Sequence, residues 1–382
     1  MIERRVVYVS GTRADFGLAE HMLHCICAHP HLELSLLVTG MHRVPAFGST
    51  ERLVEESGLP IGACVDMLFA TDTRAAMAKG IGVAILGITD ALERLAPHVV
   101  LLLGDRGEML AAAIAAVHLG IPVAHCHGGE VSGTLDEPVR HAISKLAHLH
   151  FTATTLSRDR LIRMGERPSS VFVTGAPGLD ALVRGQIPGR IELCAKYGLD
   201  TDRPWALILY HPDTGTADAA AEIDAVLAGL EHYVGQWIVF EPNSDAGYHV
   251  ILDRIEMLSE RPGTIVLRNV PRRDFLGLMA QAQVMVGNSS SGLIEAPTLG
   301  VPVVNVGRRQ ELRERGDNVL DVAAKVDAVA DAVVRACEDS AFLEQVQKGR
   351  NPYGDGYAGK RIAEILATVV LDPELIEKRF TD

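Results

Sequence analysis

The chain has 382 residues, more than one ordinary core requires, so its length favours two domains that each bury an apolar interior. Nearly half of the residues are apolar and only 5% are aromatic, as in stacked layers of helices and sheet. The formal net charge of -13 and the lack of a Lys/Arg-rich block argue against a nucleic-acid partner. A few arginines and helix N-termini still suffice to bind one small anion.

The six cysteines show no CxxC spacing, which favours a reducing compartment over a disulfide framework. The apolar run that follows the N-terminal residues, Val6 to Val9, is too short for a signal-peptide core or a membrane span. We therefore expect a cytoplasmic protein with no membrane partner.

Short β-branched runs alternate with longer helical patterns through the first half of the chain. The expected strands are 6–10, 34–39, 99–103, 123–126 and 171–174. The expected helices are 18–28, 73–96, 108–119, 137–147 and 156–164. This alternation predicts a doubly wound, Rossmann-like α/β domain over residues 1–180.

The alternation restarts after a stretch rich in Gly and Pro at 175–189. The expected strands there are 206–210, 237–240, 264–267, 284–287 and 303–306. We predict a second Rossmann-like domain over residues 190–355, and a last helical segment at 359–382 that packs back on the first domain. Open α/β sheets bind ligands outside the carboxyl ends of their strands, so we expect the site in a cleft between two facing domains.

The first strand leads into a turn of small and polar residues, Gly11 to Gly17, that opens a helix and suits a phosphate. It contains neither GxGxxG nor GxxxxGK[ST], so it is neither a dinucleotide fingerprint nor a Walker A loop. Arg13 either reaches an anion across the cleft or is a solvated loop arginine. Asp105 and Arg106 follow another strand; they either serve a ligand or form a helix cap beside a surface arginine.

The densest polar cluster of the chain follows the strand at 123–126. It contains His125, His127 and Glu130, with Asp136 and Arg140 on or just before the next helix. Ionisable groups at a strand end between apolar flanks are candidates for tuned acids and bases. A His-x-His pair also suits a metal, but no HExxH accompanies it, and we expect no metal.

In the second domain, His211 and Asn243 follow successive strands and predict a binding rim. The segment Gly287 to Pro297, GNSSSGLIEAP, brings hydroxyls, backbone N–H groups and a helix N-terminus to one place, which suits a diphosphate. Glu295 is expected in the first turn of that helix, where it either accepts ribose hydroxyls or only complements the helix dipole.

Five motifs together resemble the hydrolysing UDP-N-acetylglucosamine 2-epimerases of sialic-acid biosynthesis. They are GTRADFG at 11–17, GDRGE at 104–108, HGGEVSGT at 127–134, RHAISKLAH at 140–148 and GNSSSGLIEAP at 287–297. The likeness continues through 304–310 and 316–320, so it spans nearly the whole chain.

This resemblance implies the two-domain fold of B-type glycosyltransferases, with the nucleotide held mainly by the second domain. The residues that it implies for the nucleotide diphosphate are Arg13, Arg106, His211, Asn243, Ser289, Ser290, Glu295 and Arg309. Those that it implies around the sugar are Asp105, His125, Glu130, Asp136 and Arg140, and His127 and His42 complete the candidate catalytic set. No cofactor is expected, and a homodimer or homotetramer is.

The implied reaction converts UDP-N-acetylglucosamine to N-acetylmannosamine and UDP. It eliminates the C2 proton and the nucleotide to give a 2-acetamidoglycal, which is then hydrated. Some relatives carry Glu where this chain has His127. The alternatives are the same reaction on a UDP- or GDP-linked 2,4-diacetamido-2,4,6-trideoxy sugar for legionaminic-type acids, a non-hydrolysing epimerase, a glycosyltransferase of the same fold, and a sugar-nucleotide sensor.

Overall fold

The chain folds into two compact units in the computed structural model. The structure describes residues 4–45, 50–69, 73–132, 136–184, 187–212, 218–242, 248–268 and 270–379. Unit 1 comprises Met1–Glu130, Asp136–Val183 and Tyr353–Asp382, and unit 2 comprises Val131–Leu135 and Arg184–Pro352.

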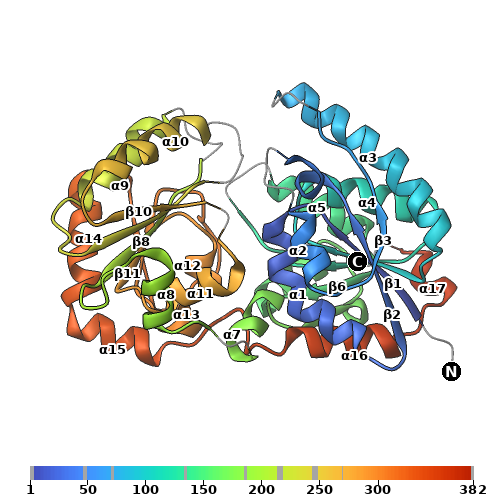
Figure 1. Cartoon of the computed structure of the whole chain (residues 1–382). Coiled ribbons are helices and arrows are strands. Elements are labelled where there is room, and N and C mark those ends of the chain that lie inside the picture. Colours follow the sequence, from blue (N-terminus) through green and yellow to red (C-terminus); the bar gives the residue numbers. More distant parts are fainter. Residues whose placement is uncertain are drawn as a thin grey trace. The chain divides into compact units, whose positions relative to one another are not determined.

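Unit 1 is built on a seven-stranded parallel sheet in the order β3-β2-β1-β4-β5-β6-β7 (Figure 1). The strands are β1 (Arg4–Ser10), β2 (Leu32–Val38), β3 (Ile61–Cys64), β4 (Val99–Leu103), β5 (Val123–Cys126), β6 (Leu149–Thr152) and β7 (Val171–Val173). The strand order reverses between β1 and β4. The carboxyl ends of these two strands are therefore the topological switch point, where ligands bind in open α/β sheets.

Helices cover both faces of this sheet. They are α1 (Arg13–Cys27), α2 (Glu51–Glu56), α3 (Arg74–Leu95), α4 (Gly107–His118), α5 (Asp136–Leu146), α6 (Thr155–Arg163), α7 (Asp180–Arg184), α16 (Ala358–Thr368) and α17 (Pro373–Ile376), with 3-10 turns at Gly40–Arg43, Pro168–Ser170 and Pro177–Leu179. The segment expected as one helix from residue 359 onward is two helices, because Asp372 caps a new one with Pro373 in its first turn.

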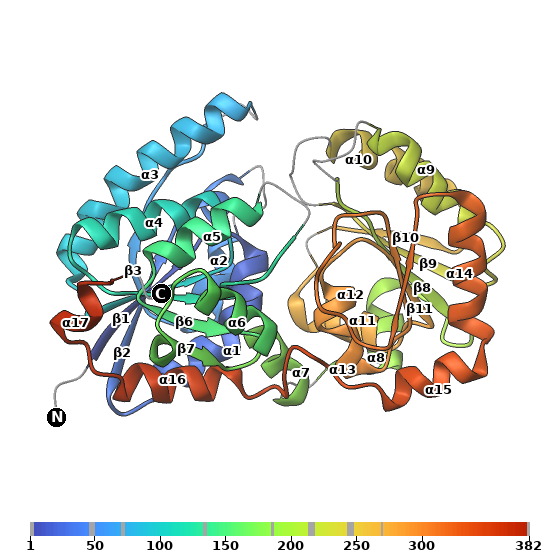
Figure 2. The same ribbon diagram turned by 180° about the vertical axis from the view of Figure 1, so that it is seen from behind.

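Alternation along β1 separates the two cores of unit 1. Val6 and Tyr8 point into a core shared with α1 and α16, whereas Val7 and Val9 point into a core shared with α3 and α4. Figure 2 shows α16 beside α1, far apart in sequence but packed together. Asp180 fixes the start of α16 by accepting the N–H groups of residues 358 and 359 at 2.9 and 2.6 Å.

Among the described residues, α3 is the single helix long and apolar enough to cross a membrane by length and composition. The core helix of a soluble protein passes the same test, and α3 packs against α4 through Ala84, Ile88 and Ala91. This packing buries one side of α3, whereas Met77, Val83 and Leu86 on the same helix are exposed.

Unit 2 repeats the plan with a six-stranded parallel sheet in the order β10-β9-β8-β11-β12-β13. The strands are β8 (Trp205–Leu209), β9 (Gln236–Phe240), β10 (Thr264–Leu267), β11 (Val284–Gly287), β12 (Val303–Val306) and β13 (Val319–Val322). The helices are α8 (Arg190–Tyr197), α9 (Ala219–Gly229), α10 (Tyr248–Met257), α11 (Arg272–Ala280), α12 (Ser291–Ile294), α13 (Ala296–Leu299), α14 (Val326–Glu338) and α15 (Ser340–Lys348), with a 3-10 turn at Leu258–Glu260. Its switch point lies between β8 and β11, and the predicted fold class of two doubly wound α/β domains is confirmed.

Candidate active site

One buried carboxylate closes the turn after β1. Asp15 accepts the N–H groups of Gly11 and Thr12 at 3.0 and 2.7 Å, the Thr12 hydroxyl at 2.9 Å and the Ser10 hydroxyl at 2.5 Å. Thr12 caps α1 and forms a capping box with Asp15, so the helix begins at Arg13 rather than after it. Arg13, expected on a loop, is thus the first residue of α1, where partial burial lowers its pKa.

His42 completes this buried network. Its Nε2 lies 3.0 Å from the Ser10 hydroxyl and its Nδ1 lies 2.8 Å from the Thr50 hydroxyl. Burial lowers the pKa of His42 to about 4, so the ring is neutral at pH 7. The proton of Ser10 goes to Asp15, so Nε2–H of His42 donates to the Ser10 oxygen and Nδ1 accepts from Thr50. Both ring nitrogens thus contact protein groups, which suits positioning rather than proton transfer.

The ionisation of Asp15 should make unit 1 less stable as pH rises. Burial raises the pKa of Asp15 from 3.8 to about 6, although the hydrogen bond from Ser10 acts in the opposite direction. A pKa shift of this size corresponds to about 3 kcal/mol. Because the folded pKa is the higher one, this contribution is fully present below about pH 4 and is lost as pH rises through about 6. We expect the stability advantage of the wild type over Asp15→Asn to fall by about 2 kcal/mol between pH 4 and pH 7 in urea unfolding followed by circular dichroism. A difference independent of pH would contradict this expectation.

The turn after β4 packs directly on the turn after β1. Glu108, buried in the first turn of α4, accepts from Nε of Arg106 at 2.7 Å. A Cβ at Gly11 would lie 2.2 Å from Oε1 of Glu108, so a larger residue there would require the Glu108 side chain to move. The side chain of Arg106 is 40% exposed and lies at the switch point that these turns form.

Arg140, on α5, links the ends of β4 and β5. Its guanidinium forms an ion pair with the carboxylate of Asp105, and its Nη1 donates to the backbone carbonyl of Glu130 at 3.1 Å. The Arg140 side chain is 5% exposed, whereas that of Asp105 is 21% exposed. Arg140 therefore fixes the Asp105 carboxylate, part of which remains exposed and accessible to a ligand.

His125 holds the turn that precedes Asp105 in place. Its Nε2 lies 2.7 Å from the carbonyl oxygen of Gly104, and its Nδ1 lies 3.1 Å from the hydroxyl of Ser144 on α5. Burial lowers the pKa of His125 to about 3, so the ring is neutral. A carbonyl only accepts, so the single ring proton is on Nε2 and Ser144 donates to Nδ1. His125 thus fixes the Gly104 turn, where φ is +83°, next to Asp105.

His127 lies beyond the end of β5 and contacts the second predicted carboxylate. Its Nδ1 is 2.6 Å from Oε1 of Glu130, and both residues are buried. The turn requires left-handed backbone at His127, with φ of +63°, and at Gly129, with φ of +78°. The structure therefore brings His127, Glu130, Arg140 and Asp105 together, and Asp136 begins the helix that carries Arg140.

In unit 2, Asn288 joins the ends of the two central strands. Its Oδ1 accepts the N–H of His211 at 2.7 Å and its Nδ2 donates to the His211 carbonyl at 2.8 Å, so the side chain pairs as a backbone strand would. The hydroxyls of Ser289 and Ser291 lie 2.7 Å apart just beyond it, with Ser290 between them. Three of the residues expected to bind a diphosphate therefore surround this switch point.

Glu295 is placed differently from the prediction. It lies at the junction of α12 and α13, each four residues long, and not in the first turn of one longer helix. Pro297 falls in the first turn of α13 and breaks the helix there. The buried Glu295 carboxylate forms an ion pair with Arg272 of α11, so a guanidinium rather than the helix dipole compensates its charge.

The connection from β12 to β13 returns to Asn288. Arg309 Nη1 and Gln310 Nε2 donate to the Asn288 carbonyl at 3.3 and 2.9 Å, and Arg313 Nη1 donates to Gln310 Oε1 at 3.1 Å. Arg309 thus contacts Asn288, the residue whose side chain binds the backbone of His211. Asn243, the remaining predicted nucleotide residue, lies outside the described residues.

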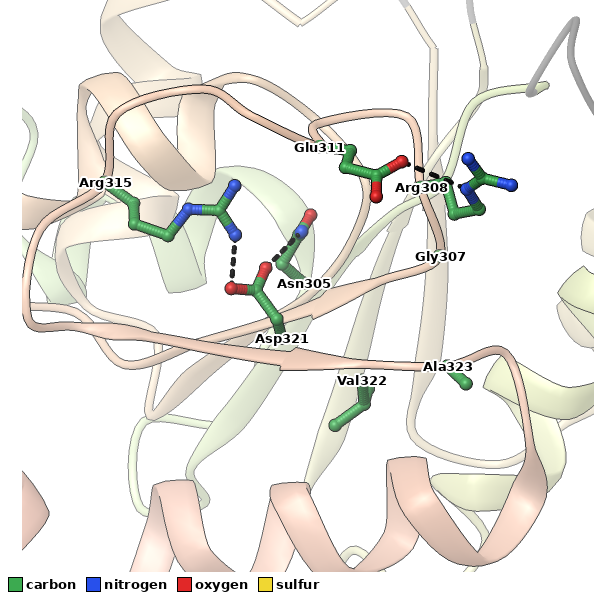
Figure 3. Close-up of a pocket in the computed structure, with 8 residues that line it drawn as sticks. All are labelled: Asn305, Gly307, Arg308, Glu311, Arg315, Asp321, Val322 and Ala323. Carbon is green, nitrogen blue, oxygen red and sulfur yellow. Dashed lines mark hydrogen bonds and ion pairs between the residues drawn. The ribbon is translucent and has the colours of Figure 1, made fainter. Parts of the chain in front are cut away.

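A pocket of about 380 Å³ lies at the carboxyl ends of β12 and β13 (Figure 3). Arg315 pairs with Asp321, which also accepts from Asn305 Nδ2 at 2.8 Å, and Arg308 pairs with Glu311 at 3.0 Å. None of the predicted site residues lines this pocket. Its charged side chains are paired with one another.

Several polar residues of these networks were not among the predicted site residues. They include Ser10, Asp15, Glu108, Ser144, Arg272, Asn288, Gln310 and Arg313. Most lie inside or next to the motifs, so the motif boundaries were a usable signal for them. Arg272 had no such signal, since it is 23 residues from its partner. Within the described residues, no three His, Cys, Asp or Glu side chains gather as metal ligands would.

Sequence comparison decides the family. The profile described as UDP-N-acetylglucosamine 2-epimerase matches residues 24–367. The chain belongs to this family.

Two relatives match almost the whole chain. The UDP-N,N'-diacetylbacillosamine 2-epimerase (hydrolyzing) of Legionella pneumophila is 43% identical over 376 residues, 98% of both chains. The UDP-N-acetylglucosamine 2-epimerase of Neisseria meningitidis serogroup B is 32% identical over 385 residues, 99% of both chains. These relatives place the chain among enzymes that act on nucleotide sugars.

The fold is also that of a solved relative. The crystal structure of UDP-GlcNAc 2-epimerase from Neisseria meningitidis, bound to UDP-GlcNAc, superimposes with a TM-score of 0.83 at 21% identity, over 95% of this chain and 99% of that one. This 2-epimerase chain therefore has a B-type glycosyltransferase-like fold, with two parallel-sheet α/β units.

Proposed function

We propose that this chain is a hydrolysing 2-epimerase whose substrate is UDP-linked 2,4-diacetamido-2,4,6-trideoxyglucose, the sugar also called N,N'-diacetylbacillosamine. The observation that carries the chemistry is the placement of two carboxylates, Asp105 and Glu130, at adjacent strand ends. The buried Arg140 pairs with the Asp105 carboxylate and binds the backbone carbonyl of Glu130, whose own carboxylate contacts His127. The sugar is proposed because the relative named for it is 43% identical, against 32% for the relative named for UDP-N-acetylglucosamine. The latter substrate is the second candidate.

The C2 hydrogen is not next to a carbonyl, so cleavage of the C1–O bond must run ahead of its removal. The diphosphate leaves with the bonding electron pair, a carboxylate takes the C2 proton, and a 2-acetamidoglycal remains. Water then adds its oxygen to C1, and a proton is delivered to C2 on the face opposite to the one from which the first proton was removed, which inverts C2. We assign these proton transfers to Asp105 and Glu130 together, with His127 orienting Glu130 and Arg140 orienting Asp105.

Stabilisation of the leaving diphosphate is the second requirement. We assign it to Ser289, Ser290, His211 and Arg309 at the switch point of unit 2, together with the arginines Arg13 and Arg106 of unit 1 and with Asn243. Hydrogen-bond donors fixed in advance at such a site contribute about a hundredfold to a thousandfold each. The enzyme is further proposed to act in the cytoplasm as a homo-oligomer.

Incubation with the nucleotide sugar in deuterated water tests this proposal. We expect free sugar with inverted C2 carrying deuterium at that carbon, and one UDP released per sugar, both followed by NMR. The diacetamido substrate should react faster than UDP-N-acetylglucosamine by kcat/KM. A deuterated sugar still joined to UDP would instead establish the non-hydrolysing reaction. UDP binding with no turnover of either substrate would favour a transferase or a sensor.

A further inference from the structure

An ionic cluster of two buried residues, Glu166 and His150, and two partly exposed lysines lies at the C-terminal end of α5, outside the candidate site. The Glu166 carboxylate accepts from Nζ of Lys145 at 2.7 Å, from Nζ of Lys378 at 2.6 Å and from Nε2 of His150 at 3.0 Å. Burial alone would raise the pKa of Glu166, but the hydrogen bonds from His150 and the two lysines lower it to about 2. The carboxylate is therefore ionised at neutral pH.

Lys378 also binds the end of the helix itself. Its Nζ lies 3.2, 2.8 and 2.6 Å from the carbonyl oxygens of Ser144, Lys145 and Ala147, at the last turn of α5 and just after it. A helix C-terminus carries about half a negative charge, so Lys378 neutralises both this end and Glu166. Its contacts join residues more than 230 positions apart in the sequence.

Stability alone explains such a cluster poorly. Taking charges out of water is costly, and apolar replacements of buried ion pairs are often neutral or stabilising. The lysine pair and Glu166 nevertheless meet at one end of the helix whose other residues hold the candidate catalytic turns. Positioning of that helix is a function that apolar packing would meet less specifically.

A continuous series of contacts leads from Lys378 to Asp105. Lys378 binds the carbonyl of Ser144, the hydroxyl of Ser144 binds His125, and His125 binds the carbonyl of Gly104, the residue before Asp105. Arg140, one turn earlier on α5, binds the Asp105 carboxylate directly. Movement of α5 would therefore displace both the backbone and the side chain of Asp105.

We propose that Lys378 is a positioning residue for the reaction: by fixing the end of α5, it holds Arg140 and Ser144 where they orient Asp105. This inference rests on the proposed function in so far as Asp105 is catalytic. Lys378 itself touches neither Asp105 nor Glu130 through any contact described above.

The test compares Lys378→Met and Lys378→Arg with the matched control Arg379→Met. Arg379 is the neighbouring cation, and it is exposed and paired only weakly, at 3.6 Å, with Glu377. We expect Lys378→Met to lower kcat about tenfold with KM changed less than about twofold, since small misplacements of catalytic groups reduce rate more than binding. Lys378→Arg should recover kcat to within about threefold, and Arg379→Met should match the wild type.

A second readout does not require turnover. In long-range 1H–15N spectra of histidine-labelled protein, the Nε2–H signal of His125, assigned by its loss in His125→Gln, should exchange with water faster in Lys378→Met than in Arg379→Met. The contrary result is that Lys378→Met lowers the melting temperature and yet leaves unchanged both the His125 signal and kcat, measured at temperatures at which the variant is folded. In that case the cluster only stabilises the fold and the inference is wrong. If the wild type turns over no nucleotide sugar, the proposed function fails instead, and the His125 signal still decides whether Lys378 controls the turn.

Discussion

Replacing Asp105 with asparagine is expected to lower kcat about a thousandfold, the middle of the range for loss of a positioned acid or base. Asparagine keeps the size of the side chain and can still accept from Arg140, but it cannot take a proton from C2. The ion pair with the buried Arg140 means that the substitution also removes the partner of a buried charge. Turnover should therefore be measured by UDP release at a temperature below the melting transition of the variant.

The control for this substitution is Asp90→Asn, which makes the same chemical change on the exposed surface of α3. It should keep wild-type turnover. Glu130→Gln should resemble Asp105→Asn, because its carboxylate is the other member of the proposed pair. Wild-type turnover in both Asp105→Asn and Glu130→Gln, with both proteins folded, would falsify the assignment of the proton transfers.

The second large effect is expected for Gly287→Ala in unit 2. At Gly287 φ is +145°, and a Cβ there would lie 2.0 Å from the carbonyl oxygen of Leu209 on β8. Because backbone cannot move aside as a side chain can, β8 and β11 must separate where Asn288 joins them. We expect a loss of about 3 kcal/mol or more in the free energy of unfolding, and a loss of UDP binding in the variant that remains folded.

Gly198→Ala separates the clash from the backbone conformation. Gly198 has a φ of +68° after α8, but a Cβ there would meet nothing within 4 Å. Its substitution should cost only about 1 kcal/mol, the price of left-handed backbone for alanine. Both tryptophans of the chain, Trp205 and Trp237, are buried in unit 2, so tryptophan fluorescence in urea reports the unfolding of that unit. Equal losses in the two variants would show that the clash with Leu209 is relieved.

The strands that were predicted from sequence are those with continuous apolar runs. β6, Leu-His-Phe-Thr, was missed because half of its residues are polar, and the buried His150 pairs there with Glu166. β3 and β13 were missed because they are short edge strands with glycine or aspartate inside them. A run of apolar residues in the sequence indicates a strand that is buried against apolar neighbours. These three strands contain polar residues or glycine and depend on other contacts.

The candidate site shows the same division. The strand-end motifs located Asp105, Glu130, His211 and Ser289, because parallel strands bring their carboxyl ends to one edge. The partners of these residues could not be deduced: Arg140 is 35 positions from Asp105, and its pairing depends on how α5 lies on the sheet. Likewise, motif spacing suggested a helix through Glu295, but Pro297 divides it.

Because residues 353–382 complete unit 1, the direction of synthesis affects the order in which the two units can finish folding. Residues 184–352 leave the ribosome before α16, so unit 2 has its whole sheet available while the face of α1 that contacts α16 is still uncovered. Domains generally fold as units during synthesis, and exposed apolar faces favour aggregation. The first unit in the sequence is thus the second able to finish folding. A nascent chain halted before residue 353 would expose Met22, against which Gly359 packs, to chaperones or to other chains.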